Sequence, residues 1–191
     1  LVDYQADLVF SEFHRLDQEA GMFYFSVPKD LYGNVYEFNT EEAAAMPEHL
    51  PFRHGCYVHP WGKLAKKEIY LRHPFIPETF YEDGPNSLRT FLESKKVVGV
   101  LIDDYTYRVN RKGAITNGPK IMKGSQDIIK CFRIRALDLV MSNVDTTSFR
   151  NEVLHNLYSD IPELERLGLT NTEEYQEAKW LVKIAEEASA R

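Results

Sequence analysis

The sequence has few cysteines and no long hydrophobic segment. Only Cys56 and Cys131 occur among 191 residues, so the fold does not depend on a disulfide framework. No apolar run approaches the ~18 residues that a membrane-spanning helix needs. The first twenty residues are acidic and do not match a secretory signal. We therefore expect reduced thiols, an intracellular, reducing compartment and no transmembrane segment.

The sequence also lacks an excess of basic residues. Its formal net charge is −6, which argues against a dedicated nucleic-acid-binding protein. The charge is segregated, because residues 1–50 carry −8, residues 51–150 carry +7 and residues 151–191 carry −5. Two interpretations stay open. The acidic ends pack beside the basic centre, or residues 51–150 bind nucleic acid or an acidic partner.

The composition is that of a globular protein, with 43% hydrophobic and 13% aromatic residues. A chain of this length and composition buries a sizeable core without disulfide bonds.

The first half of the sequence predicts one helix, two strands and a second, short helix. Apolar residues at spacings of three and four predict a helix over residues 3–20, and Gly21 ends it. Strands are expected at 22–27 and 35–38, and Thr40 is expected to cap a helix over 41–46.

Residues 47–86 are irregular in pattern. They hold six of the nine prolines and four of the six histidines. Within them, the segment 67–72 has the composition of a strand. A stretch of forty residues with this little regular structure usually wraps over a surface.

The second half gives clearer signals. A short helix over 87–93 precedes the continuous apolar run Val97–Ile102, which is typical of a buried strand. Residues 105–109 alternate and predict a half-exposed strand. Helices are expected from Ser125 and over 149–158, a new start is expected at Asp160–Glu163, and a last helix follows the capping pattern at Thr170–Glu173.

These elements predict an α+β fold, in which a mostly antiparallel sheet is packed by an N-terminal helix and a C-terminal helical group. We expect residues 1–145 to form an α+β core, with the irregular Pro-rich wrapping segment at 47–86. Residues 146–191 are expected to form a C-terminal helical segment packed on the same core.

Asp103 and Asp104 follow the buried strand and form the most chemical motif of the chain. Two carboxylates at a strand exit can hold a divalent cation against substrate phosphates. The structural alternative is a tight turn between two strands, where Asp is common. The pattern favours the turn over a catalytic role.

His54, Cys56 and His59 are candidate metal ligands, because imidazole and thiolate bind zinc. Their spacing matches no standard zinc motif, and loop packing explains them more simply. Neither a phosphate-binding loop nor a dinucleotide fingerprint is present, so the sequence identifies no cofactor.

No assembled catalytic pattern emerges, so the balance leans against an enzyme. We expect a non-enzymatic interaction or structural subunit of a larger protein assembly, with a protein partner. The first alternative is a metal-dependent enzyme that processes phosphates or nucleic acids with Asp103 and Asp104. The second is a nucleic-acid-binding module that uses the basic centre, with Tyr57, Trp61, Tyr105 and Tyr107 as stacking surfaces.

Overall fold

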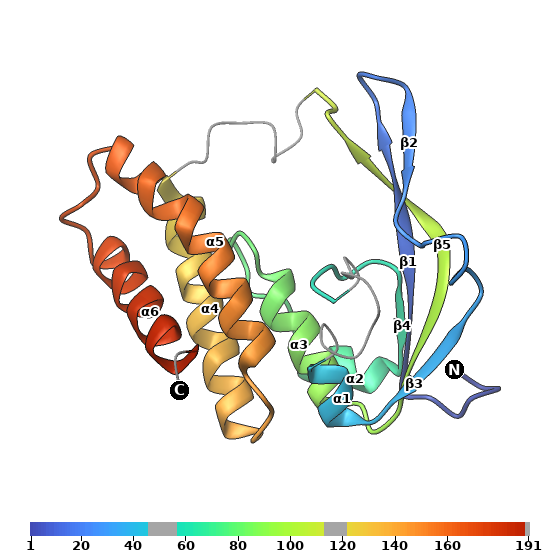
Figure 1. Ribbon diagram of the computed structural model, residues 1–191. Helices are drawn as coiled ribbons and strands as arrows, with labels where there is room; N and C mark the ends of the chain where they lie inside the picture. The colour runs from blue at the N-terminus through green and yellow to red at the C-terminus, as the bar shows by residue number, and fades with distance from the viewer. Residues whose placement is uncertain (46–56, 113–121, 190–191) are drawn as a thin grey trace. The chain divides into compact units, whose positions relative to one another are not determined.

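The computed structural model describes residues 1–45, 57–112 and 122–189 (Figure 1). Its contacts divide the chain into two compact units. The first comprises Leu1–Ile76 and Asn86–Pro119, and the second comprises Pro77–Pro85 and Lys120–Arg191. The expectation that residues 146–191 pack on a core formed by 1–145 stays a prediction.

A five-stranded sheet forms the first unit. Its strands are β1 (Leu8–Asp17), β2 (Met22–Phe25), β3 (Val35–Phe38), β4 (Lys63–Ala65) and β5 (Val97–Val109). Their order is β2-β1-β5-β3. β2 pairs with the C-terminal part of β1, and β4 pairs with its N-terminal part. The central pair β1–β5 is parallel, whereas the other pairs are antiparallel. The expected α+β class with a mostly antiparallel sheet is confirmed.

The predicted N-terminal helix is wrong, because most of residues 3–20 form β1 in the centre of the sheet. Five of the six residues from Leu8 to Phe13 are buried. A central strand covered on both faces has no regular alternation of apolar and polar residues. The dense apolar residues of this segment therefore matched a helical spacing by chance, and pairing with β5 decided the conformation.

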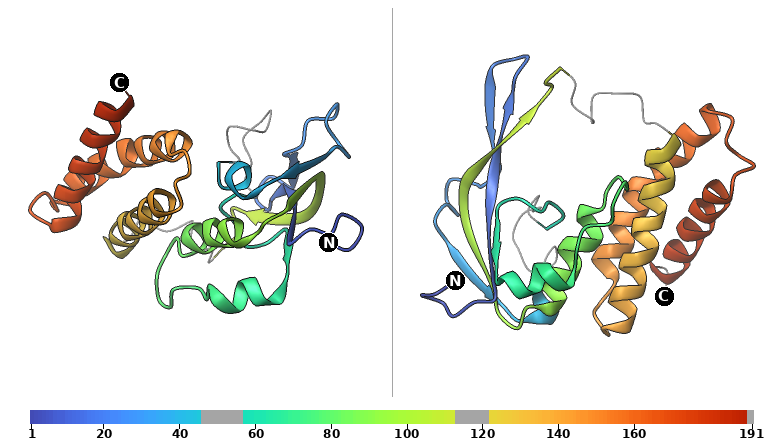
Figure 2. Two further views of the ribbon diagram at one scale, coloured as in Figure 1. Left: turned by 90° about the horizontal axis from the view of Figure 1, so that it is seen from below. Right: turned by 180° about the vertical axis from the view of Figure 1, so that it is seen from behind.

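The predicted turn at Asp103 and Asp104 is also wrong. β5 runs without a break through both residues, from Val97 to Val109. It stays extended because β1 lies beside it over its whole length (Figure 2). The two carboxylates consequently lie in the middle of a central strand.

The core of the first unit forms where β1, β5 and the short helices meet. One buried cluster of this core, among the described residues, includes Leu8, Phe10, Phe38, Ala43, Tyr57, Phe91 and Val97. Phe10 pairs with Gly99 on β5. A Cβ at Gly99 would lie 2.4 Å from the Phe10 ring, so glycine is what lets this ring cross the neighbouring strand.

Three short helices accompany the sheet: α1 (Thr40–Ala44), α2 (Lys67–Arg72) and α3 (Asp83–Glu93). The cap of α1 is Asn39 and not Thr40, and Asn39 forms a capping box with Glu42. The strand expected at 67–72 is helix α2. Glu68 in its first turn and Arg72 in its last turn complement the helix dipole.

The second unit contains α4 (Met122–Met141), α5 (Thr147–Arg166) and α6 (Glu173–Ser189), which contact one another (Figure 2). The helix start expected at Asp160 is wrong, because α5 continues through Pro162. Its neighbours Ile161 and Leu164 are buried, and their packing outweighs the hydrogen bond that proline removes.

A buried ion pair joins α4 to α5. The Arg135 side chain is 3% exposed and donates two hydrogen bonds, of 2.6 and 2.7 Å, to the Glu152 carboxylate. The guanidinium also lies 5.0 Å from the centre of the Phe149 ring. The pair thus sets the register of α4 against α5. Within the described residues, no helix is long and apolar enough to cross a membrane.

Gly99→Ala is expected to lower the free energy of unfolding by about 1–3 kcal/mol, because the added methyl group overlaps the Phe10 ring. Gly124→Ala is the matched control, since the nearest atom to its new Cβ would be 4.0 Å away. Urea unfolding of both variants measures the effect. Equal stability of the two variants would contradict the predicted overlap.

Glu152→Ala is expected to destabilise the protein by about 2–3 kcal/mol, since it leaves the Arg135 charge buried without this carboxylate. Glu187→Ala removes a carboxylate from an exposed pair at 3.9 Å and should cost less than about 0.5 kcal/mol. Chemical denaturation compares the two. A loss for Glu152→Ala as small as that for Glu187→Ala would refute the role of the buried pair.

Candidate functional site

The candidate site lies at an irregularity in the β1–β5 ladder. Between the pairs Leu8↔Val97 and Phe13↔Tyr105, five residue steps of β1 face eight of β5. The register shifts on both sides of Glu12. Such bulges re-aim side chains and are common beside active sites. Here the bulge brings carboxylates from both strands to one place.

Two of these carboxylates are covered. Glu12 is fully buried and pairs with Asp103 across the ladder. Both Asp103 oxygens are shielded from solvent, and from the part of the chain that the structure describes neither accepts a hydrogen bond of ordinary geometry. Burial raises the pKa of Asp103. The backbone amides of Val27 and Ser26 and the nearby His14 oppose this rise in pKa, whereas the Glu12 charge adds to it.

His14 lies beside this acidic pair. Its Nε2 atom is 2.7 Å from the Thr106 hydroxyl. The imidazole also lies between Phe23 and Phe25 of β2, with ring centres at 5.3 and 5.5 Å. The histidine is therefore held by one polar and two aromatic contacts.

Asp104 differs from Asp103, because it is exposed. Its Oδ1 atom accepts a hydrogen bond from the Ser11 hydroxyl. The Ser11 amide in turn donates to the Gly62 carbonyl at 2.8 Å. Ser11 thus holds the Asp104 carboxylate next to the loop that precedes β4, and the bulge offers this group to solvent.

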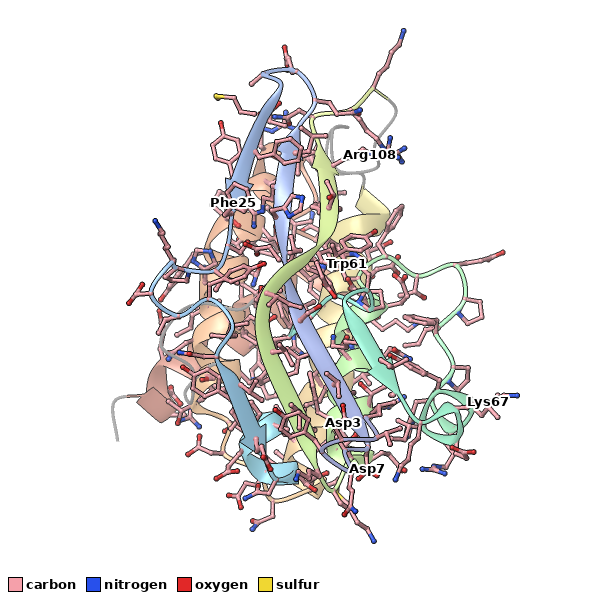
Figure 3. All side chains as sticks on the ribbon, turned by 90° about the vertical axis from the view of Figure 1, so that its right-hand side faces the viewer. Asp3, Asp7, Phe25, Trp61, Lys67 and Arg108 are labelled. Atoms are coloured by element: carbon pink, nitrogen blue, oxygen red, sulfur yellow. The ribbon has the colours of Figure 1, made fainter. Side chains whose placement is uncertain are left out.

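That loop carries part of an aromatic stack, which consists of Phe13, His59, Trp61, Tyr105 and Tyr107. Trp61 is nearly parallel to His59, Tyr105 and Tyr107, with ring centres 4.3, 4.6 and 5.3 Å away. Phe13 meets the Trp61 ring edge to face at 4.5 Å. In Figure 3, Trp61 lies beside the middle of the β1–β5 pair.

The fold brings two of the predicted site residues together with residues that were not predicted. Asp103 and Asp104 come together with Glu12, Ser11 and His14, which the sequence analysis did not identify as candidates. Glu12, Ser11 and His14 were missed because residues 3–20 were expected to form a helix. A helix there gives no reason to place these side chains beside Asp103 and Asp104. The continuous apolar run before Asp103 could have been matched with a second buried strand over residues 8–13.

The predicted metal ligands are only partly described. His59 belongs to the aromatic stack, whereas His54 and Cys56 lie outside the described residues, so this metal site stays a prediction. Within the described ranges, no group of three or more His, Cys, Asp or Glu residues is placed to hold a metal ion. Cys131 is a buried free thiol, and burial raises its pKa to about 11.

No family model matches the chain, but two curated proteins of Streptococcus pneumoniae serotype 4 are similar to it. Glycosyltransferase GlyG is 27% identical over 192 aligned residues, which cover 97% of this chain and 62% of GlyG. Glycosyltransferase GlyA is 28% identical over 116 residues, or 61% of this chain and 16% of GlyA. The chain thus spans less than two thirds of either relative.

These similarities correct the functional expectation. Both relatives are named as enzymes that transfer sugars, so the expectation of a non-enzymatic interaction or structural subunit is wrong. The two alternatives, a metal-dependent phosphate or nucleic-acid enzyme and a nucleic-acid-binding module, are replaced for the same reason. Scattered reactive residues in a sequence do not exclude an enzyme, because a site forms from residues that are distant in the chain.

Asp103→Asn is expected to stabilise the protein at pH 7, because folding raises the pKa of this carboxyl. The relevant pH interval runs from the ordinary Asp pKa of about 3.9, which holds in the unfolded state, up to the raised pKa of the folded state. Within it, the folded protein binds more protons than the unfolded protein. The parent protein therefore gains stability as the pH falls through this interval. The advantage of the variant should shrink towards pH 4, which urea unfolding at several pH values will measure.

Asp7→Asn is the control for Asp103→Asn, because folding lowers the pKa of Asp7 and raises that of Asp103. The Asp7 carboxylate bonds to Lys66 and to the amides of Lys95 and Lys96, and Lys66 is the main cause that lowers its pKa. This variant should be less stable than the parent at pH 7, and its deficit should disappear only below the ordinary Asp pKa. If both variants shift stability in the same direction at pH 7, the assignment for Asp103 is wrong.

Proposed function

We propose that this chain is part of a glycosyltransferase. The observation that carries the proposal is the similarity to GlyG, which extends over 97% of the chain. The similarity to GlyA over 61% of the chain supports the same activity. Because the chain spans 62% of GlyG, the activity and the substrates of the whole protein are part of the proposal.

Glycosyl transfer needs a group that accepts the proton of the acceptor hydroxyl. The acceptor oxygen forms a bond to the anomeric carbon of an activated sugar donor. The bond from that carbon to the leaving group breaks, and the leaving group departs with the electron pair. The hydroxyl proton passes to a base, for which a positioned carboxylate is suited.

We assign contact with the acceptor hydroxyl to Asp104. Glu12 is fully buried and both oxygens of Asp103 are covered, so these two carboxylates do not reach a substrate in this conformation. Asp104 is exposed and is oriented by Ser11. We propose that Glu12 and Asp103 act indirectly, by shaping the bulge that presents Asp104.

A transfer assay tests whether the protein is a glycosyltransferase. The protein, in its natural length, is incubated with a panel of nucleotide sugars and sugar acceptors, and mass spectrometry detects the acceptor that has gained one sugar. GlyG serves as the positive control. The proposal predicts turnover with at least one donor. Turnover by GlyG on substrates of the panel, with none by this protein on any pair, would refute a glycosyltransferase.

Asp104→Asn is expected to lower kcat by about 10²-fold or more, because the amide keeps the shape but accepts no proton. Asp30→Asn removes another exposed carboxylate, in the connection between β2 and β3, and should retain the parent rate. Steady-state kinetics on the best donor–acceptor pair separate kcat from KM. A parent-like kcat for Asp104→Asn would reject the assigned role.

We further propose an intracellular, reducing compartment, which the buried free thiol of Cys131 supports. Two expectations about partners stay predictions: a protein partner, and contact of residues 51–150 with nucleic acid.

A further inference from the structure

We propose that Tyr105, supported by Trp61, is a stacking surface for the pyranose ring of a neutral sugar, and that Asp104 binds a hydroxyl of the same sugar. The inference rests on the proposed glycosyltransferase function and names the chemistry of its acceptor. It depends on the geometry of the aromatic stack and on the environment of Asp104.

The aromatic stack holds Trp61 in one orientation. His59 and Tyr105 are nearly parallel to its ring, at interplanar angles of 14° and 12°. Phe13 stands at 88° to it. Aromatic pairs in these arrangements are each favourable beyond the area that they bury. Trp61 is therefore a rigid support, and ordering it for a ligand costs little entropy.

Tyr105 is exposed, whereas the other four rings of the stack are buried or half-buried. It is 39% exposed although it lies in a central strand. Trp61 stacks on one face of the Tyr105 ring, while the residue keeps its exposure to solvent. An exposed aromatic ring held on a rigid support is typical of a binding surface.

A pyranose ring matches this surface in two ways. One side of the sugar presents C–H groups, whose positive edges favour the negative face of an aromatic ring. Its hydroxyl groups point outward and donate hydrogen bonds to a carboxylate, which accepts several at once. Asp104 is exposed and lies near the loop that carries Trp61, because its carboxylate accepts a hydrogen bond from Ser11, whose amide donates to the Gly62 carbonyl next to Trp61.

The charge at this position favours a neutral ligand over a phosphate. Among the described residues, the hydrogen-bonding partner of Asp104 is the Ser11 hydroxyl, which carries no charge. Glu12 and Asp103 lie at the same bulge. The exposed Asp104 carboxylate repels a nucleotide diphosphate, so the stack suits a neutral acceptor sugar better than the charged part of a donor.

Fluorescence of Trp61 tests the inference without turnover. The chain has two tryptophans, so Trp180→Phe leaves Trp61 as the sole reporter. The 191-residue chain with this change is titrated with glucose, galactose, N-acetylglucosamine and lactose, and separately with UDP. We expect a saturable change in emission with at least one neutral sugar, at a Kd in the millimolar range, and none with UDP.

Tyr105→Ala should weaken sugar binding about tenfold, because it removes the stacking face, whereas Tyr105→Phe should retain it. Tyr24→Ala is the matched control, since Tyr24 is 48% exposed on β2, away from the stack. Asp104→Asn leaves all rings in place and should also weaken binding. This variant tests the site independently if Tyr105→Ala does not fold.

The outcomes separate this inference from the proposed function. Transfer activity without any sugar-dependent change at Trp61 would overturn the stacking surface and leave the glycosyltransferase intact. Sugar binding that Tyr105→Ala abolishes, in a protein without transfer activity, would keep the surface and refute the enzyme. A response to UDP alone, or equal losses for Tyr24→Ala and Tyr105→Ala, would also overturn the inference.

Discussion

The parallel pairing of β1 with β5 is the constraint on which the rest of the first unit depends. It places two segments about ninety residues apart side by side, and such non-local pairing is stable only when both strands bury their side chains. Phe10 meets this condition by crossing Gly99, where any side chain would collide with its ring. β2, β3 and β4 then pair onto the edges of this central pair.

The same pairing creates the candidate site. Leu101, Ile102 and Asp104 of β5 have no partner on β1, so β5 bulges on both sides of the Glu12–Asp103 pair. A regular ladder would send these neighbouring side chains to opposite faces of the sheet. Asp103 is covered beside Glu12, whereas Asp104 is exposed and accepts a hydrogen bond from Ser11. Burying one carboxylate without an ordinary hydrogen bond is unfavourable, and functional sites are where proteins tolerate such costs.

Function was harder to predict than fold class, for a physical reason. Asp103 and Asp104 stood out from the sequence, but no fixed spacing joined them to Glu12, Ser11 or Trp61. Ser11 and Glu12 lie on β1, the two aspartates lie on β5 and Trp61 precedes β4. Hydrogen bonds and ring contacts formed on folding bring these segments together. Because that convergence is invisible in the sequence, the expectation of a structural subunit was wrong. Similarity to GlyG along nearly the whole chain corrected it.

The sequence by itself determined the elements whose signals are local. These include the buried strand from Val97 and the last helix, which follows the capping pattern at Thr170–Glu173 as expected. Tertiary structure alone decided that residues 8–17 form a strand, that β5 continues past Asp104, and that α5 continues past Pro162. In each of these cases the local preference was weak or opposed, and burial against a distant segment supplied the larger free energy.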